Sequence, residues 1–225
     1  MGPCIAIEER PVKVIAMDEI QLIQTRLLES AAVKTRLANL GAPAIAEAAQ
    51  RVSDSISSGG KLMLCGNGGS AGDSQHLAAE FTSRLRASLE RPGIPALALT
   101  TDTSFLTARA NDYSFDEVFE RLVDVWGRAG DVLIAITTSG NSQNLIRAAQ
   151  RCRQKEIFTI GFLGQTGGQL LPLVDLPILV PSDSTQHVQE CHITIGHILC
   201  ELVEEKLYGP TDSTLDVKRK QLSTV

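Results

Sequence analysis

Short apolar runs alternate with longer amphipathic stretches along most of this chain. Five of the runs have the length of a strand and the continuous apolar character of strands buried on both faces. They cover 61–65, 95–99, 132–136, 157–161 and 176–180, and helical stretches separate them. Buried strands that alternate with helices are typical of a parallel sheet covered on both faces, so the pattern predicts an α/β fold in three layers.

Two helices are expected before the first strand. The first covers residues 17–39 and carries an apolar stripe made by Ile20, Ile23 and Leu27. The second runs to about residue 57, and Gly41-Ala42-Pro43 separates the two because proline breaks or kinks a helix. One sheet does not need this much cover. We therefore expect these helices to pack against partner subunits or, alternatively, to cap the sheet.

The rest of the pattern predicts a single domain over residues 17–208. A long helix from Thr185 to Leu207 closes the fold. Residues 1–16 are expected to form a loose extension and residues 209–225 a tail.

The most informative segment follows the first predicted strand and reads GNGGSAGDSQHLAAE over residues 66–80. A glycine-rich turn between a strand and a helix lets backbone N–H groups approach an anion, and the helix N-terminus adds a partial positive charge. His76 and Glu80 lie four positions apart and therefore on one face of the helix. The segment predicts an anion site with a metal-binding or acid–base pair beside it, which favours a phosphorylated small molecule as ligand.

A second polar loop reads ITTSGNSQN over residues 136–144 and also follows a buried strand. The hydroxyls of Thr137, Ser139 and Ser142 can each donate a hydrogen bond to a phosphate oxygen. Ordinary capping of the next helix is the alternative for this loop. Because both loops follow parallel strands, they are expected at the same sheet edge, which favours phosphate binding.

The first loop also matches the dinucleotide fingerprint G-x-G-x-x-A at Gly66, Gly68 and Ala71. That fingerprint requires an acidic residue near the end of the next strand, and Asp102 lies too far along the chain for a good fit. A nicotinamide site also has no role for the second loop. The sequence therefore disfavours a dinucleotide-binding protein.

Three of the four histidines fall within eleven residues of the last predicted helix. Gln189 and His197 lie roughly 80° apart around an ideal helix and about 12 Å apart along it, so they can barely share one metal ion. His192 is better placed beside Gln189. The spacing alone leaves both histidines open as ligands, and it predicts that His187 lies on the surface.

Composition and charge limit the classes of partner. The net charge of −5 and pI near 5.4 disfavour nucleic acid, and the basic run Lys218-Arg219-Lys220 is expected to be part of a solvated tail. No apolar run approaches the length of a membrane span. The five cysteines form no Cys-x-x-Cys pair, which fits reduced thiols in the cytoplasm.

These residues together resemble the sugar isomerase (SIS) family and, within it, the phosphoheptose isomerases. The resemblance covers about residues 20–208. The matching motifs are Gly66-Asn67-Gly68-Gly69-Ser70, His76-x-x-x-Glu80, Asn111-Asp112, Thr138-Ser139-Gly140-Asn141-Ser142, and Gln189-Glu190-x-His192 with His197.

The resemblance implies a three-layer αβα sandwich with a five-stranded parallel sheet of the flavodoxin-like kind, joined by the N-terminal helices. It implies an aldose–ketose isomerase that interconverts sedoheptulose 7-phosphate and D-glycero-D-manno-heptose 7-phosphate. The product would serve heptose biosynthesis for lipopolysaccharide, capsule or another glycoconjugate. A cytoplasmic homotetramer with active sites near subunit contacts is implied as well.

The resemblance also implies a set of site residues. One zinc ion per subunit is expected at His76, Glu80, Gln189 and His197, which favours His197 over His192 as the ligand. Contacts to the substrate are expected from Asn67, Gly68, Gly69, Ser70, Glu80, Arg84, Asn111, Asp112, Thr137, Thr138, Ser139, Ser142 and Gln189.

Ketose–aldose isomerisation moves a proton between adjacent carbons through an enediol, and it needs a base at carbon and an acid at oxygen. Our hypothesis is that Glu80 is the base, that His197 moves protons at oxygen, and that zinc supplies a Lewis acid. A carboxylate bound to zinc is a poorer base. Either Glu80 leaves the metal during turnover or another group is the base.

The alternative is a non-catalytic SIS protein that binds the replication initiator or senses a phosphosugar. Relatives that bind the initiator tend to lack the acidic residue four positions after the first histidine, or the last histidine. Glu80 and His197 are both present here, which favours the enzyme.

Overall fold

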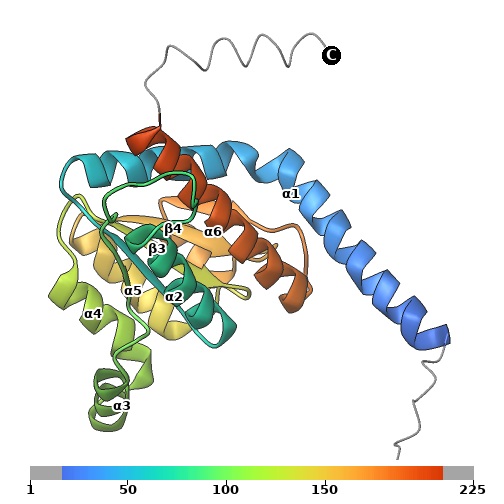
Figure 1. Cartoon of the computed structure of the whole chain (residues 1–225). Helices are drawn as coiled ribbons and strands as arrows, with labels where there is room; N and C mark the ends of the chain where they lie inside the picture. The colour runs from blue at the N-terminus through green and yellow to red at the C-terminus, as the bar shows by residue number, and fades with distance from the viewer. Residues whose placement is uncertain (1–16, 210–225) are drawn as a thin grey trace, which may run out of the picture.

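The computed structural model describes residues 17–209, and one sheet of five parallel strands lies at its centre (Figure 1). In chain order the strands are β1 (Leu62–Gly66), β2 (Ala96–Ala98), β3 (Val132–Thr137), β4 (Phe158–Leu163) and β5 (Leu176–Leu179). Their order across the sheet is β2-β1-β3-β4-β5, and every neighbouring pair is parallel. The predicted sheet is therefore confirmed, with the strand order of flavodoxin-like folds.

Helices cover both faces of this sheet. One face is buried by α1 (Met17–Ser57), α2 (Gly69–Thr82) and α6 (Thr185–Tyr208), and the other by α4 (Val118–Trp126) and α5 (Gln143–Gln154). The connections contain α3 (Thr103–Asp112) and two short 3-10 helices, Phe115–Glu117 and Gly168–Leu173. Successive side chains of a strand point to opposite faces, so Leu62 joins the first core and Met63 the second. The three predicted layers are confirmed.

The prediction of two N-terminal helices is wrong, because α1 continues from Met17 to Ser57 with Pro43 inside it. Pro43 lacks the N–H that would bond the carbonyl of Asn39. Both residues are exposed, so water can reach that carbonyl, whereas Gly41 and Ile45 on the other side of the helix are buried. Burial of this continuous face offsets the roughly 3 kcal/mol that a proline costs inside a helix.

The first turns of α1 extend beyond the body of the molecule (Figure 1). Residues 18–29 are all exposed, and Ser30 is the first buried residue of the helix. The predicted apolar stripe is therefore uncovered, with Leu27 67% exposed and its neighbour Leu28 70% exposed. This half of α1 does not cap the sheet.

The two polar loops meet at one edge of the sheet, as predicted. The carboxyl ends of β1 and β3 are adjacent, with Gly66 paired to Ile136. The chain continues from β1 into α2 on one face and from β3 into α5 on the other face. In open parallel sheets, ligands bind outside the carboxyl ends of the strands at such a switch point.

The predicted closing helix is confirmed as α6, which ends at Tyr208. Residues 1–16 and 210–225 lie outside the described residues, and with them the expected N-terminal extension, nearly all of the expected tail and the basic run Lys218-Arg219-Lys220. Within residues 17–209, no helix combines the length and the apolar character that crossing a membrane requires.

Candidate active site

Two histidines and a glutamate meet where α2 lies against α6. The Nε2 atoms of His76 and His197 are 2.8 Å apart, and the two rings meet edge to face. Glu80, one turn after His76, places its Oε1 3.5 Å from the same nitrogen of His76. One ligand atom from each residue lies within 4.8 Å of the others. Such spacing suits one divalent cation with two imidazole ligands and a carboxylate.

A glycine brings the two histidines together. Gly196 of α6 packs on Leu77 of α2, and a Cβ at position 196 would lie 2.4 Å from Leu77 Cδ1. His197 and His76 are the chain neighbours of these two residues. The missing side chain at Gly196 therefore allows the helices to approach closely enough for the rings to meet.

The other histidines of α6 lie elsewhere. His192 is fully buried and packs against Phe162 of β4, with ring centroids 6.0 Å apart. Neither of its ring nitrogens has a hydrogen-bond partner among residues 17–209. Burial lowers the pKa of His192 to about 4, although the backbone of Leu163 opposes the shift. His192 is therefore a neutral histidine of the core, packed against Phe162, whereas His197 is the one that meets His76.

The prediction that His187 lies on the surface is wrong. His187 is only 8% exposed. It belongs to the first turn of α6, which packs beside α1, where His187 lines a hollow together with Val33 and Arg36. The sequence pattern of α6 alone predicts an exposed side chain at position 187, and α1 is the neighbour that covers it.

Gln189 reaches the beginning of α2. Its amide lies directly on Gly69, where a Cβ would be 2.2 Å from the Gln189 Nε2. The side chain at position 69 must therefore be absent for Gln189 to take this place. This contact agrees with the prediction that Gly69 and Gln189 belong to one site. Their roles in binding a ligand stay predictions.

Asp73 also belongs to this site, and the sequence analysis missed it. Burial raises the pKa of the Asp73 carboxyl, while a hydrogen bond with Gln189 and the nearby His76 and His197 oppose the shift. Its Oδ2 is buried with no hydrogen-bond partner in the described part of the chain. A signal was present, because Asp73 lies three positions before His76 and therefore on the same helical face.

The loop after β1 is fastened to the start of α5. The side-chain amides of Asn67 and Asn144 exchange two hydrogen bonds, of 3.0 and 2.9 Å. Gly68 and Gly69 are exposed, and no side chain caps α2 at Gly68. The backbone N–H groups of this helix start are therefore not taken by a capping side chain, whereas Ser70, only 7% exposed, faces inward.

The loop after β3 presents hydroxyls at the same edge. Thr137 is buried and accepts a hydrogen bond from the N–H of Gly140, while Ser139 accepts one from the N–H of Asn141. Thr138 and Ser142 are partly exposed. Ser142 occupies the N-cap position of α5 but makes no capping hydrogen bond with its side chain. The alternative of ordinary helix capping requires the Ser142 hydroxyl to accept a hydrogen bond from an N–H of the first turn of α5, and it does not.

Three predicted site residues are exposed and are paired with residues outside the histidine cluster. Arg84 is exposed and pairs with Glu90 at 2.6 Å. Asn111 and Asp112 end α3, are exposed, and bond to each other at 2.9 Å. Figure 1 shows α3 beyond α4 and well apart from α6. Asp102 caps α3 by accepting a hydrogen bond from the N–H of Phe105.

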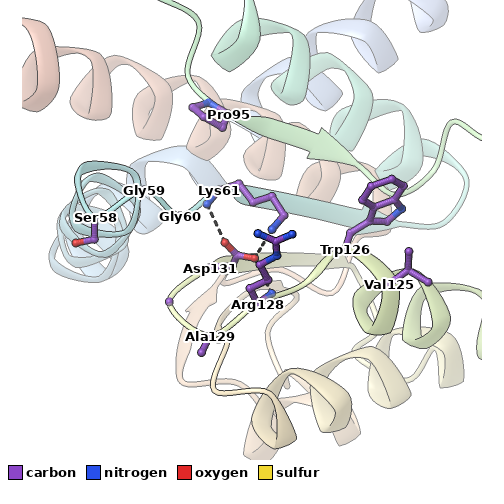
Figure 2. Close-up of a pocket in the computed structure, with 11 residues that line it drawn as sticks. Ser58, Gly59, Gly60, Lys61, Pro95, Val125, Trp126, Arg128, Ala129 and Asp131 are labelled. Atoms are coloured by element: carbon purple, nitrogen blue, oxygen red, sulfur yellow. Dashed lines mark hydrogen bonds and ion pairs between the residues drawn. The ribbon is translucent and has the colours of Figure 1, made fainter.

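A hollow of about 520 Å³ lies at the opposite, amino edge of the sheet (Figure 2). Lys61 and Asp131, which precede β1 and β3, form an ion pair there at 2.5 Å. Arg128 and the exposed Trp126 line the same hollow. None of the predicted site residues contributes to this hollow, so it is separate from the histidine cluster.

Comparisons with known proteins identify the family of this chain. The SIS domain family model matches residues 27–164. The phosphoheptose isomerase of Pelodictyon phaeoclathratiforme is 50% identical over 188 residues, which are 83% of this chain and 89% of that protein. Among solved structures, the phosphoheptose isomerase GmhA from Neisseria gonorrhoeae is 37% identical with a TM-score of 0.77, covering 82% of this chain and 98% of the other. The Francisella tularensis phosphoheptose isomerase is 34% identical with a TM-score of 0.80, covering 83% and 98%.

Proposed function

Because this chain belongs to the SIS domain family and is about half identical to phosphoheptose isomerases, we propose that it is an aldose–ketose isomerase acting on sedoheptulose 7-phosphate. Its product is D-glycero-D-manno-heptose 7-phosphate. The observation that carries this proposal is the His76–Glu80–His197 cluster, which lies on α2 and α6, and α2 begins at the first polar loop. Acid–base groups and an anion-binding edge are the two parts that isomerisation of a sugar phosphate needs.

The cluster fits a zinc ion, which we propose is bound once per chain by His76, Glu80, Gln189 and His197. Two imidazole nitrogens and a carboxylate oxygen are preferred zinc ligands. Ligand nitrogens on tetrahedral zinc lie about 3.3 Å apart for bonds of about 2.0–2.1 Å. The two Nε2 atoms, at 2.8 Å, therefore need to separate by only roughly half an ångström. Zinc bound there supplies a Lewis acid for the carbonyl oxygen of the sugar.

Glu80 is the proposed base at carbon. Its side chain is 22% exposed and reaches the site from the last turn of α2. Glu80 takes the proton from the carbon next to the carbonyl, and the electron pair of the broken C–H bond forms the C=C bond of an enediol. The same carboxyl then returns a proton to the adjacent carbon, so the overall reaction consumes and releases nothing.

His197 is the proposed acid and base at oxygen. Its Nε2 lies beside that of His76 and is the atom that zinc would take, so Nδ1 is the ring nitrogen left to exchange protons. While the proton moves between the two carbons, one hydroxyl of the sugar must lose a proton and the former carbonyl oxygen must gain one. A histidine is suited to both transfers, because an imidazole nitrogen can both donate and accept a proton.

The two loops are the proposed phosphate site. Hydrogen bonds to the phosphate oxygens would come from the N–H groups at the start of α2 and from the hydroxyls of Thr137, Thr138, Ser139 and Ser142. These donors are all uncharged. Asn67 is held by Asn144, so we assign it a role in fixing the shape of the loop. A fixed phosphate places the distant end of the sugar over Glu80 and His197.

A homotetramer is the proposed assembly. The uncovered stripe at the start of α1 needs a partner, because large contiguous apolar patches are rare on monomers. Asn111 and Asp112, which lie on α3 and apart from α6 in one chain, would meet substrate at a contact between subunits, and Arg84, one turn after Glu80, would meet it beside the cluster. The four cysteines of the described chain are free and buried, which supports a reducing compartment, the cytoplasm. We assign the product to heptose biosynthesis for lipopolysaccharide, capsule or another glycoconjugate.

Turnover in D₂O tests this function. The purified protein is expected to convert sedoheptulose 7-phosphate into the aldose and to place deuterium on the carbon next to the new carbonyl. Glu80→Gln is expected to lower kcat by at least about a hundredfold. Deuterium at that carbon establishes the enediol route, whereas its absence requires that the transferred hydrogen never exchanges with solvent. Bound phosphosugar with no product would favour a sensing or partner-binding SIS protein, and normal turnover by Glu80→Gln would remove Glu80 as the base.

A further inference from the structure

A buried arginine outside the cluster is bonded to the backbone that carries Glu80. Arg91 lies in the connection between α2 and β2, and its side chain is fully buried. Its Nη2 donates to the carbonyl of Glu80 at 2.8 Å, and its Nη1 donates to the carbonyls of Phe81 and Pro92, each at 2.9 Å. Its Nε donates to Glu204 at 2.8 Å. All three nitrogens of the guanidinium are thus in use.

These bonds fix the end of α2. The last four carbonyls of a helix have no partner within the helix, and a cation at that end is favourable. Arg91 supplies donors to two of those carbonyls, and one of them belongs to Glu80 itself. The position of the Glu80 backbone therefore depends on where Arg91 is held.

Glu204 holds Arg91 and lies on α6. Its side chain is fully buried, and it also accepts hydrogen bonds from the N–H of Leu85 and the Nε of Arg86, both at 3.1 Å. Burial raises the pKa of the Glu204 carboxyl, but these hydrogen bonds and those from Arg91 outweigh it, so the pKa is lowered overall. Glu204 stays charged at neutral pH and remains a partner for Arg91.

Three contacts join α2 and α6 along their length. Gln189 lies on Gly69 at the start of α2, and Gly196 lies on Leu77 in the middle. The third contact is the Arg91–Glu204 ion pair just beyond the end of α2. Glu204 follows His197 by seven residues, about two turns, so both project from nearly the same side of α6.

We propose that Arg91 and Glu204 are positioning residues, which set the separation between Glu80 on α2 and His197 on α6 for metal binding and proton transfer. This inference rests on the proposed function. Stability alone does not account for the pair, because a buried ion pair replaced by apolar residues is often neutral or more stable. Four directed bonds from one planar group instead fix a position, which a single apolar contact does not.

The test is the double variant Arg91→Met with Glu204→Met. It removes both charges of the buried pair together, and Arg86, the other partner of Glu204, keeps its ion pair with Glu205, so no buried charge is left unpaired. The zinc dissociation constant is measured by competition with a chelating dye, and kcat and KM are measured with sedoheptulose 7-phosphate. The variant is expected to fold but to bind zinc about tenfold or more weakly, the loss typical of residues behind metal ligands. We expect kcat to fall similarly and KM to change less than about threefold.

Two further variants control the test. Arg91→Lys keeps the charge but not the planar fork, and it is expected to weaken zinc binding while keeping the fold. Lys61→Met with Asp131→Asn removes an ion pair at the amino edge of the sheet, opposite to the polar loops, in a hollow that no residue of α2 or α6 lines, and is expected to leave zinc affinity and kcat unchanged. This control shows whether the loss of an ion pair as such is responsible.

The outcomes separate the two claims. Wild-type zinc affinity and kcat in both Arg91 variants would overturn the positioning role while the proposed function stands. Equal losses in the opposite-edge control would also overturn it, because the effect would then be general. A wild-type protein that neither binds zinc nor turns over would overturn the proposed function, and this inference with it.

Discussion

The Nε2 atoms of His76 and His197 lie 2.8 Å apart although 121 positions separate the two residues in the chain. The contact exists because α2 and α6 approach each other closely at Gly196 and Leu77. Glu80 joins the two rings from the next turn of α2. The chemistry of this protein is therefore tied to how precisely two helices are held together.

Removal of His197 is predicted to release the metal, whereas removal of His192 is not. His197→Ala takes away one of two imidazole ligands, and we expect zinc affinity to fall by more than about a hundredfold. His192→Leu alters only the core beside Phe162, and zinc content is expected to stay at one ion per chain. Metal analysis after dialysis measures both. Loss of zinc from the His192 variant, with retention in the His197 variant, would reverse the assignment.

A methyl group at Gly196 is predicted to push α6 away from α2. Its Cβ would lie 2.4 and 2.5 Å from the two terminal carbons of Leu77, which is fully buried. Gly196→Ala is expected to cost about 1–3 kcal/mol in the free energy of unfolding and to weaken zinc binding.

Shortening Leu77 makes room for the added methyl group. Leu77→Ala combined with Gly196→Ala is expected to cost less than the two single changes added together. Denaturant unfolding of all four proteins measures this coupling. Strict additivity would show that the two residues do not limit how closely the helices approach.

Acid is predicted to destabilise the protein through His192. Its pKa is about 4 when folded and about 6.5 when unfolded, so the unfolded state binds the proton first as pH falls. The contribution of His192 to stability is complete above about pH 6.5 and is lost progressively toward pH 4, with a loss of about 2 kcal/mol at pH 5. Between pH 8 and pH 5, the free energy of unfolding of His192→Leu is expected to fall by about 2 kcal/mol less than that of the wild-type protein. Parallel pH profiles of unfolding free energy would contradict it.

The start of α1 is predicted to hold the assembly together. Leu27 and Leu28 are 67% and 70% exposed in the single chain. Leu27→Glu with Leu28→Glu is expected to lower the mass in solution from about four chains to two or one, because charged side chains cannot be buried cheaply. Val125→Glu, at another exposed apolar position that lines the hollow at the amino edge of the sheet, is expected to leave the mass unchanged. Light scattering decides between these outcomes, and an unaltered mass in the α1 variant would exclude this stripe as the contact.

The sheet was predictable because its strands are buried on both faces. A run such as Leu62–Gly66 is apolar throughout, and this pattern, together with the helices between the runs, determines both the number of strands and the layers. The polar loops were predictable for the same reason, since each follows directly on such a run. His76 and Glu80 followed from helical spacing alone.

Contacts between distant segments were not predictable in this way. Helix geometry places His192 closer than His197 to Gln189; the family resemblance favoured His197, and the physical reason, the close approach of α2 at Gly196, is visible only in the structure. Pro43 predicted a break in the helix because it leaves the carbonyl of Asn39 without a hydrogen-bond partner. The sequence does not reveal that this carbonyl lies on the exposed side of α1, where water can reach it. The pair of Arg91 and Glu204, 113 positions apart, carries no local signal at all.

Metal removal tests the central claim most directly. The protein is stripped with a chelator, its turnover of sedoheptulose 7-phosphate is measured, and zinc is then returned in steps. The account predicts that turnover disappears with the metal and returns fully at one zinc per chain. Undiminished turnover by metal-free protein would contradict it, because His76, Glu80 and His197 would then act without a metal ion between them.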